Sequence, residues 1–555
     1  MKASDLFIKC LEDEGVKYIF GLPGEETSDL MISLLDSKKI KFILVRHEQG
    51  AAFMADVYGR LTQKVGICLS TLGPGATNLT TGVANANMDR SPLLAITGQT
   101  GTDVLHKESH QNMDVVTMFK PITKWSWSIS NPDSIPEIIR RAFKISSAEK
   151  SGAVHLVLPQ DIAKKHSEIK PITNQELSRS RPNDELVKKG AKMILEAKRP
   201  LILVGNGVIR ESASPCLRRF TEQTGICSMN TFMAKGVISD KSERHLQTIG
   251  IKEADHAQIA MREADLVVAV GYDLVEYSPK NWNRQLDKKI IHIDSTLAEV
   301  DTYYPPTIEI AADIEYTIEA LLNELEQLKK KNPILEGFTH SEVPPIFRKT
   351  KEEVVWRVDR YKNDFSYPIK PEKLVTDVRS VFDENDIIIS DVGAHKLWIA
   401  KVYNTYSPNT CLITNGFCSM GFALPGAIAA QLARPNRKVV AMCGDAGFLM
   451  NVQELETAVR LNLPIIIVVW CDSDLGMISL KQIDEFGKSA FTKFSNPNFV
   501  KLAESFGAIG YCVKSTQEFP RVLKKAKKST HIPIIVSMDV DYARNRILLD
   551  DNFLG

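Results

Sequence analysis

Residues 438–477, KVVAMCGDAGFLMNVQELETAVRLNLPIIIVVWCDSDLGM, carry the clearest structural signal in the chain. Two β-branched apolar runs, Val439–Met442 and Ile465–Trp470, enclose a segment in which apolar residues recur at helical spacing. We therefore predict a strand, a single helix and a second, parallel strand joined by a right-handed crossover. Asp445 follows the first strand and Asp472 follows the second, so both side chains are expected at the carboxyl edge of one parallel sheet.

Two carboxylates at one sheet edge predict a divalent metal site. Mg²⁺ prefers hard oxygen ligands and retains phosphate oxygens among them, so Asp445 and Asp472 suit a magnesium ion bound to a phosphorylated cofactor. The small residues of the segment 444–447 would let backbone amides approach the anion, beside the positive N-terminus of the helix. The alternative is that Asp445 is a turn residue and 472–474 a solvated loop. Agreement between the spacing, the strands and the helix favours the metal site.

The rest of the chain repeats this alternation of apolar strands and helices, which is typical of parallel sheets covered on both faces. Two polar, proline-containing stretches, 164–184 and 326–371, are interpreted as linkers, although the second also contains helix-compatible segments. We therefore predict three α/β domains with doubly wound parallel sheets, at residues 1–165, 185–325 and 370–545. The predicted strands include Phe42–Val45, Gly66–Ser70, Ala153–Leu158, Leu201–Val204, Leu266–Val270, Ile290–Ile293, Ile387–Ser390 and Ile534–Met538.

Composition excludes several classes of protein. The 555 residues contain 69 Lys and Arg against 68 Asp and Glu, a balance that argues against a nucleic-acid or membrane-surface protein. No apolar run approaches the roughly 18–20 residues of a membrane span, and the N-terminus lacks the apolar core of a signal peptide. The nine cysteines include no CxxC pair, so neither a disulfide framework nor a structural zinc site is expected. A cytoplasmic protein is the expectation.

A second cluster of candidate residues surrounds Glu48 in the segment FILVRHEQG. Glu48 stands at the junction of a strand, 41–45, and an alanine-rich helix, so we expect its carboxyl group to point into an apolar cavity. Burial there would raise the pKa of Glu48 and permit proton exchange near neutral pH. The alternative is an exposed acid at a helix N-terminus, stabilised by the helix dipole.

Further candidate segments along the chain are Gly21–Glu25, Thr71–Asn78, His110–Asp114, Asp391–His395 and Asn415–Phe422. Taken in order with Glu48 and Gly444–Met477, these segments resemble the thiamine-diphosphate-dependent enzymes of the acetohydroxyacid synthase and pyruvate decarboxylase superfamily. The resemblance spans about residues 1–550 and is closest to the FAD-free catabolic acetolactate synthases. Its fold implies a first, pyrimidine-binding domain, a central domain of Rossmann-like form and a third, diphosphate-binding domain.

The resemblance assigns roles to individual residues. It implies that Glu48 assists activation of the coenzyme, and that Asp445, Asp472 and the main-chain carbonyl of Asp474 hold Mg²⁺. Gln111 becomes a hydrogen-bond donor to the reacting carbonyls, with a helix cap beside a solvated histidine as the alternative. The residues expected at the coenzyme are Pro23, Glu48, Thr71, Pro74, Asn78, Gly393, Ala394, His395, Met420, Gly444, Asp445, Ala446, Gly447, Asp472, Asp474, Leu475, Gly476 and Met477.

Met420 occupies the position of the large apolar residue that wedges the coenzyme into its bent form, although a core methionine is the alternative reading and both can hold. Ala446 replaces the usual glycine and is tolerated if its φ angle is negative. Glu25-Glu26 replaces an Ala-Lys pair that is common in catabolic acetolactate synthases, which would change the substrate pocket. The middle block lacks the Arg-Phe-Asp-Asp-Arg type segment of FAD-binding relatives, so FAD is not expected.

The activity that the resemblance implies is acetolactate synthesis: decarboxylation of pyruvate on thiamine diphosphate and transfer of the remaining unit to a second pyruvate. Such an enzyme would serve branched-chain amino acid or acetoin biosynthesis. The family also implies a homodimer or homotetramer with active sites at the subunit interface, for which the apolar helix beside Glu48 would be suited. Two alternatives are another thiamine-diphosphate-dependent decarboxylase or carboligase for 2-oxo acids, and a non-catalytic homologue.

Overall fold

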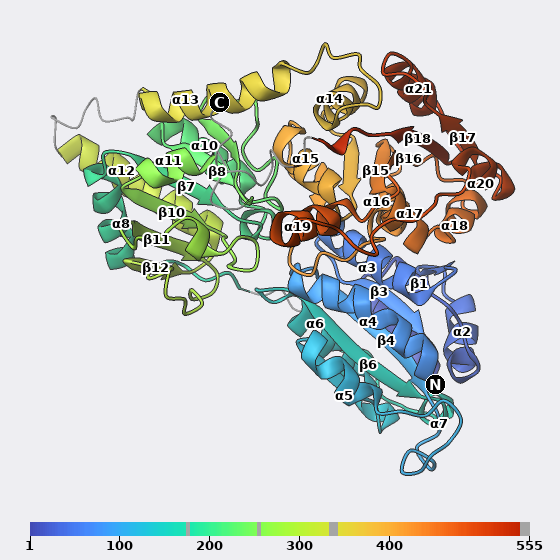
Figure 1. Ribbon diagram of the computed structural model, residues 1–555. Coiled ribbons are helices and arrows are strands. Elements are labelled where there is room, and N and C mark those ends of the chain that lie inside the picture. The colour runs from blue at the N-terminus through green and yellow to red at the C-terminus, as the bar shows by residue number, and fades with distance from the viewer. Residues whose placement is uncertain (174–177, 252–256, 332–341, 544, 546–555) are drawn as a thin grey trace.

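The structure is a computed structural model that describes residues 1–173, 178–251, 257–331, 342–543 and 545. Three six-stranded sheets, each flanked by helices, follow one another along the chain (Figure 1). Every strand pairing within them is parallel, which confirms the predicted α/β class. No helix among the described residues is long and apolar enough to cross a membrane. The predicted limits of the three domains remain predictions.

The first sheet has the strand order β2-β1-β3-β4-β6-β5. The side on which new strands are added changes at β1: β2 lies on one side of β1, and all later strands lie on the other side, beginning with β3. In an open parallel sheet, ligands bind at such a switch point, beyond the carboxyl ends of the strands. The elements are α1 Ala3–Asp13, β1 Tyr18–Gly21, α2 Ser28–Leu35, β2 Lys41–Leu44, α3 Glu48–Thr62, β3 Gly66–Ser70, α4 Gly73–Met88, β4 Leu93–Gln99, α5 Val115–Phe119, β5 Trp125–Ser128, α6 Ile135–Ser147, β6 Ala153–Pro159 and α7 Gln160–Lys164.

The middle sheet has the order β12-β11-β10-β7-β8-β9. Counted from its own first strand, this is the order of the dinucleotide-binding fold, so the prediction of a Rossmann-like central block is confirmed. The elements are α8 Asp184–Glu196, β7 Pro200–Val204, α9 Gly207–Arg210, α10 Ser214–Thr224, β8 Cys227–Asn230, β9 His245–Thr248, α11 Ala257–Glu263, β10 Leu266–Val270, β11 Lys289–Asp294, β12 Ile308–Ala311, α12 Ile314–Lys331 and α13 Pro345–Asp359.

The third sheet, β14-β13-β15-β16-β18-β17, repeats the strand order of the first. Its switch point therefore lies between β13 and β15. The elements are α14 Pro371–Val381, β13 Ile387–Ser390, α15 Ala394–Val402, β14 Cys411–Ile413, α16 Ala423–Ala433, β15 Val439–Gly444, α17 Asp445–Met450, α18 Glu454–Arg460, β16 Ile466–Cys471, α19 Gly476–Phe486, α20 Phe499–Ser505, β17 Ile509–Cys512, α21 Glu518–Lys527 and β18 Ile534–Asp539.

The predicted strand pair around the two aspartates is present, with Gly444 of β15 beside Trp470 of β16. The prediction of one helix between them is wrong, because α17 and α18 are separate. Asn451 breaks the helix: it is 1% exposed, and its side-chain amide donates to the Gly421 carbonyl at 2.8 Å. That hydrogen bond ties the turn between the two helices to the loop that carries Met420.

The helix that begins at Glu48, α3, is covered within its own chain. It packs against α4 and against α16 of the third block, and one apolar core extends across all three helices. Small residues permit the approach: a Cβ at Gly82 would lie 2.4 Å from the Ala52 Cβ, and one at Gly426 2.9 Å from Val57 Cγ2. The idea that this helix is left apolar for a second subunit is therefore wrong, since α16 covers it.

The stretch 326–371 is only partly a linker. It contains the end of α12 and all of α13, which packs against α11 and β9 of the middle block. Phe347 of α13 is fully buried in the core beneath the middle sheet. The sequence indicated a linker because the stretch is rich in lysine and proline. These residues made the apolar positions of α13 hard to recognise as one face of a helix.

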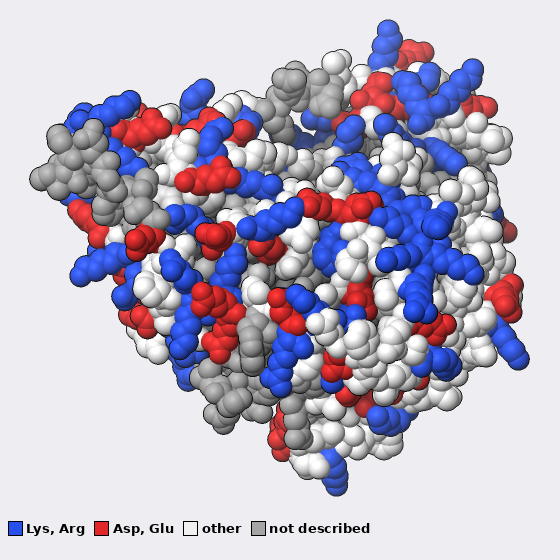
Figure 2. All heavy atoms as spheres, turned by 90° about the horizontal axis from the view of Figure 1, so that it is seen from above, with Lys and Arg blue, Asp and Glu red and all other residues white. Residues whose placement is uncertain are grey.

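Charge is balanced over the whole chain but is unevenly distributed over the face seen from above. In the view from above, Lys and Arg are mixed with Asp and Glu over the left of the molecule, whereas Lys and Arg gather to the right of the centre (Figure 2). Helix α21 of the third block exposes Arg521, Lys524 and Lys525 while it buries Phe519 and Leu523, and Lys528, directly after the helix, is also exposed. These exposed cations fit the solvated face of an amphipathic helix.

Candidate functional site

A pocket of about 150 Å³ lies at the switch point of the third sheet. Its walls come from the segments that follow β13, β15 and β16, together with Met420 and Tyr542. The structure brings together here all third-block residues that the sequence placed at a cofactor: Gly393, Ala394, His395, Met420, Gly444, Asp445, Ala446, Gly447, Asp472, Asp474, Leu475, Gly476 and Met477.

Asp445 is the most constrained residue of this pocket. It is the first residue of α17 and is 2% exposed. Its Oδ1 accepts from the backbone N–H of Ala446 at 2.9 Å. Its Oδ2 accepts from the backbone N–H groups of Asp472 and Ser473, at 3.1 and 2.8 Å, and from the Asn496 side-chain amide at 2.7 Å. These four donors fix the carboxylate against the end of β16.

Asp472 shares the pocket with Asp445 and is electrostatically disfavoured as a carboxylate. Burial, and then repulsion from Asp445, raise the pKa of Asp472 to about 7. A divalent cation between the two would reverse both effects, since it supplies the missing positive charge. Among the described residues, no group of three or more His, Cys, Asp or Glu side chains is arranged to hold a metal. A metal here would therefore need ligands from main chain or cofactor.

Asp474 and His395 complete the polar lining. The Asp474 carboxylate pairs through Oδ2 with Lys493 at 2.8 Å. His395 is 2% exposed, and its Nε2 has no hydrogen-bond partner among the described residues. Burial lowers the pKa of His395 to about 3, so the ring is neutral at physiological pH. A buried imidazole nitrogen that lacks a partner beside a pocket indicates a missing polar ligand.

Gly444 and Gly447 are required because neighbouring side chains, those of His395 and Asp391, lie where a Cβ would stand. From the sequence alone, these small residues were explained only by the approach of an anion. A Cβ on Gly444 would lie 3.2 Å from His395 Cε1, and one on Gly447 2.9 Å from Asp391 Oδ1. Ala446 lies inside α17 and is not among the described residues with positive φ, so alanine is accommodated there as predicted.

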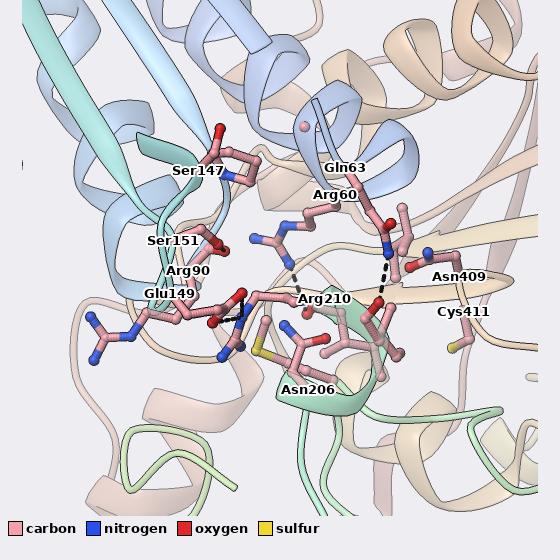
Figure 3. A pocket seen from close by; sticks show the side chains of 16 residues that line it. Arg60, Gln63, Arg90, Ser147, Glu149, Ser151, Asn206, Arg210, Asn409 and Cys411 are labelled. Carbon is pink, nitrogen blue, oxygen red and sulfur yellow. Dashed lines mark hydrogen bonds and ion pairs between the residues drawn. The ribbon is translucent and has the colours of Figure 1, made fainter. Parts of the chain in front are cut away.

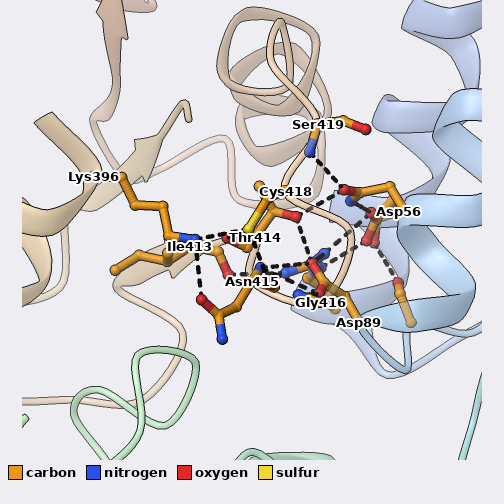
Figure 4. A network of polar contacts seen from close by, with 12 residues as sticks. Asp56, Asp89, Lys396, Ile413, Thr414, Asn415, Gly416, Cys418 and Ser419 are labelled. Carbon is orange, nitrogen blue, oxygen red and sulfur yellow. Dashed lines mark hydrogen bonds and ion pairs between the residues drawn. The ribbon is translucent and has the colours of Figure 1, made fainter. Parts of the chain in front are cut away.

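The loop 414–423, which carries Met420, is held by buried acids (Figure 4). Asp391, 1% exposed, accepts from the Gly421 and Ala423 backbone N–H groups at 2.9 and 3.2 Å. Asp89 of the first block, also 1% exposed, accepts from the Thr414 hydroxyl and the Gly416 N–H, both at 2.6 Å. First and third blocks of one chain thus jointly position Met420.

Arg60 completes this network. Its guanidinium donates to Asp56 through Nε at 2.6 Å, to Asp89 through Nη2 at 2.6 Å and to the Ile413 carbonyl through Nη1 at 3.3 Å. Both acids are essentially fully buried. Removal of one partner from such a group leaves an uncompensated buried charge, which is strongly destabilising.

Replacing Asp89 by Asn is therefore expected to lower the free energy of unfolding by about 3 kcal/mol, because Arg60 loses a carboxylate and the 414–416 loop loses a charged acceptor. Urea unfolding followed by circular dichroism measures the change. Asp36→Asn, on the exposed end of α2, is the control and should change stability by less than about 0.5 kcal/mol. Equal stability of the two variants would show that Asp89 does not hold the loop.

The first-block candidates lie at the switch point of the first sheet. Glu48 is the first residue of α3 and its Oε2 accepts from the Asn78 side-chain amide at 2.9 Å. The Thr71 hydroxyl donates to Glu26 Oε2 at 2.7 Å. Pro23 and Pro74 are exposed. Gln111 is also exposed, on a segment that rests against Gly73.

Glu48 does not point into an apolar cavity in the single chain. Its side chain is half-buried and meets the Asn78 amide, a polar neighbour. No first-block residue lines the third-block pocket. One chain therefore presents two separate half-sites, each at the switch point of its own sheet, and Glu48 and Asp445 do not share a cavity.

Two further residues support these half-sites, and the sequence reading missed both. Asn496, from the loop before α20, orients Asp445. Glu454, the first residue of α18 and 0% exposed, reaches from the third block to the first. Its Oε1 accepts from the backbone N–H groups of Arg46 and His47, both at 3.0 Å, immediately before Glu48. The sequence does offer a signal for Glu454, because an acidic residue stands there within the apolar helical pattern of residues 449–459.

Glu454 gives stability a pH dependence. Burial raises the pKa of Glu454 to about 7 from its ordinary 4.5, so the folded state binds this proton more tightly than the unfolded chain does. The contribution is complete below about pH 4.5 and is lost as pH rises through 7. Glu454→Gln keeps an Oε1 acceptor and cannot ionise, so its stability relative to the parent is expected to rise by about 3 kcal/mol from pH 4.5 to 8.

The measurement is urea unfolding of the parent and Glu454→Gln across that pH range. Glu504→Gln, on the exposed face of α20, is the control and should leave the pH profile unchanged, because Glu504 is not among the groups that shift the pKa of Glu454. Parallel profiles for the parent and Glu454→Gln would contradict the assignment.

Comparison with known proteins places the whole chain in one group. Three family models match: the N-terminal TPP binding domain of thiamine pyrophosphate enzymes over residues 1–118, their central domain over 187–321, and their C-terminal TPP binding domain over 391–538. The chain is 34% identical to an acetolactate synthase of Bacillus subtilis, over 99% of this chain and 95% of that protein. It is 32% identical to a catabolic acetolactate synthase of Raoultella terrigena, over 98% and 96%, and 35% identical to a probable acetolactate synthase large subunit of Methanocaldococcus jannaschii, over 98% and 92%.

Proposed function

Because this chain belongs to the thiamine pyrophosphate enzymes, we propose that it is an acetolactate synthase that converts two molecules of pyruvate into 2-acetolactate and CO₂. Similarity to acetolactate synthases over nearly the whole chain is the observation that carries the proposal. The pocket at the third switch point supports it, since its residues suit a diphosphate and its metal.

The residues present fit thiamine diphosphate with Mg²⁺. The carboxylates of Asp445 and Asp472 and the carbonyl of Asp474 are hard oxygen ligands, and the unpartnered Nε2 of His395 lies among the lining residues. The loop that carries Met420 is held by Asp391, which accepts from the Gly421 N–H, and by Asp89, which accepts from the Gly416 N–H. When bound, the coenzyme supplies an electron sink for decarboxylation of the 2-oxo acid.

Glu48 is the proposed proton-transfer residue. Its Oε2 is oriented by the Asn78 amide, and its helix start is fixed by Glu454 through Arg46 and His47. A carboxyl group held in this way can give and take one proton at a defined position, which is the requirement for general acid–base catalysis. Gln111 is proposed to donate a hydrogen bond to the substrate carbonyl, because its segment rests against Gly73 at the same sheet edge.

A complete site requires two copies of the chain in this proposal. Glu48 and the third-block pocket lie at different switch points of one chain, so a second copy would bring the first half-site of one subunit to the pocket of the other. We therefore propose a homodimer, or a homotetramer built from it, with sites at the subunit interface. Dependence on Mg²⁺, independence from FAD and a cytoplasmic location stay predictions from the sequence.

The test is to incubate the purified chain with thiamine diphosphate, Mg²⁺ and pyruvate. Acetolactate is measured as acetoin after acid treatment, and two pyruvates should disappear for each acetolactate and each CO₂. Acetaldehyde as the product would identify a decarboxylase instead. Coenzyme binding with no use of pyruvate would point to another 2-oxo acid, and absence of coenzyme binding would overturn the assignment.

A further inference from the structure

The loop 414–423 contains a cysteine in direct contact with a lysine (Figure 4). Lys396 stands in the first turn of α15, and its Nζ lies 3.0 Å from Cys418 Sγ. The same Nζ donates to the side-chain carbonyl of Asn415 at 3.0 Å. None of these three residues is assigned to the coenzyme, the metal or the reaction, so the proposed function does not explain the contact.

Lys396 is a buried amine without an acidic partner. It is 6% exposed. Buried lysines are almost always paired with an acid, because an uncompensated buried charge costs free energy. Here a thiol and a neutral amide take the place of the acid, and no carboxylate among the residues that the structure describes forms an ion pair with Lys396. Of these two partners, the sulfur is the one that is readily oxidised.

Cys418 is held next to this amine by its backbone and by a hydrogen bond. Its thiol donates to the Asn415 carbonyl at 2.9 Å. Its φ angle is 57°, in the left-handed region that costs free energy for a residue other than glycine and that recurs at functional sites. Cys418 is partly exposed, and Phe417 beside it is 45% exposed, so solvent reaches this part of the loop.

We propose that Lys396 and Cys418 form an oxidative modification site, at which hydrogen peroxide links Nζ to Sγ through a sulfenamide bond. First, the sulfur attacks one peroxide oxygen, the O–O bond breaks, and Cys418 becomes a sulfenic acid with release of water. The amine, after loss of a proton to solvent, then attacks the sulfur. The S–O bond breaks, the S–N bond forms and a second water leaves.

The atoms and electrons of this reaction balance. One thiol, one ammonium group and one peroxide give one sulfenamide, two water molecules and one proton. The sulfur is oxidised by two electrons, and the peroxide is reduced by the same two. Sulfenic acids are known to condense with a neighbouring nitrogen in this way, and here the nitrogen is already in contact with the sulfur.

Cys411 offers a comparison on the same stretch of chain. It lines a cavity of about 80 Å³ where the three blocks meet (Figure 3). Cys411 is 3% exposed, and burial raises its pKa to about 12. Buried cysteines of this kind remain thiols and are inert. We therefore expect Cys411 to stay reduced while Cys418 is modified.

The link would join two walls of the pocket at Asp445. Lys396 directly follows His395, and Cys418 stands two positions before Met420, and both of these neighbours line the pocket. A covalent bond between the two would close a loop that contains β14 and restrict the unfolded chain, as a disulfide does. Peroxide should therefore move the midpoint of urea unfolding to a higher urea concentration, and a thiol reductant should reverse the shift.

Peptide mapping by mass spectrometry tests the proposal. The purified chain is treated with hydrogen peroxide, its remaining thiols are blocked, and it is digested with trypsin without reductant. We expect the peptides that contain Lys396 and Cys418 to be joined, with a mass lower by two hydrogens than the sum of the two. A thiol reductant should release both peptides. No step of this measurement depends on catalysis, so its result is separate from that of the activity test.

Three variants sharpen the experiment. Cys418→Gly removes the sulfur at a φ angle that favours glycine, so circular dichroism should show an intact fold while the urea shift is lost. Lys396→Arg keeps a cation beside the sulfur but not the amine, so the linked peptide should be absent and Cys418 should be found as sulfenic or sulfinic acid. Cys512→Ser removes an exposed thiol elsewhere and should form the link as the parent does.

A parent chain in which peroxide leaves Cys418 reduced, or oxidises it without joining it to Lys396, would overturn the proposal. A link that retains an oxygen atom would rule out the S–N bond, and a link from Lys396 to Cys411 would rule out the assigned sulfur. A urea shift of equal size in Cys418→Gly would show that the effect of peroxide arises elsewhere in the chain.

Discussion

Glu48→Gln is expected to lower kcat by roughly 10²–10⁴-fold, because the variant keeps the shape and the Asn78 contact of the side chain but cannot exchange a proton. Affinity for thiamine diphosphate should change little, since Glu48 does not line the pocket that would hold the diphosphate and metal. Steady-state acetolactate formation measures the first quantity, and calorimetric titration with the coenzyme measures the second. A large loss of kcat together with an unchanged coenzyme affinity would show that Glu48 acts in the reaction and not in binding of the coenzyme.

Glu137→Gln is a suitable control for this variant, because it makes the same change on the exposed first turn of α6 in the same block. It should leave both quantities as in the parent. An active Glu48→Gln variant would remove Glu48 from the proposed mechanism while leaving the family assignment intact. Equal inactivity of the parent and the variant, with coenzyme bound, would instead favour a non-catalytic homologue.

Asp445→Asn is expected to weaken Mg²⁺-dependent binding of thiamine diphosphate by at least roughly 100-fold. The substitution removes the negative charge of a proposed metal ligand, and changes to residues one layer further from a metal already cost about 10–100-fold. Asparagine keeps only one of the two acceptor oxygens, so part of the hydrogen bonding of Asp445 is lost and the fold of the variant has to be verified. Calorimetric titration with coenzyme at saturating Mg²⁺ measures the affinity, and circular dichroism checks the fold.

Asp484→Asn, on the exposed face of α19, is the matched control and should bind as the parent does. A dissociation constant for Asp445→Asn within about threefold of the parent would contradict a metal at this position. In that case Asp472, whose pKa burial and Asp445 raise to about 7, would instead serve as a neutral acid that donates a hydrogen bond to the cofactor.

The sequence predicted the fold well where local pattern and topology agree. Continuous β-branched runs such as Leu266–Val270 and Ile387–Ser390 became strands with those limits, because strands buried on both faces leave little choice of residue. The aspartates at 445 and 472 meet at one edge because parallel strands end on the same side. Shorter or more polar strands, such as Tyr18–Gly21 and Ile509–Cys512, lack that signal and were not predicted.

The failures have physical causes that are not local. Asn451 ends a helix because its partner, Gly421, is distant in sequence, and periodicity alone cannot show such a contact. Glu454 and Asn496 stabilise the site through long-range hydrogen bonds of the same kind. The Glu48 side chain was expected in an apolar cavity, whereas in a single chain it is only half-buried.

The hydrogen bonds from Arg46 and His47 to Glu454 would couple the two active sites of a dimer. Glu454 lies a few residues beyond Asp445, so the start of the Glu48 helix is fastened to the metal-binding segment of its own chain. If subunits exchange half-sites as proposed, the acid that serves one coenzyme is anchored beside the other. A change at one site would then reach the acid of the other, so the two sites would not be independent.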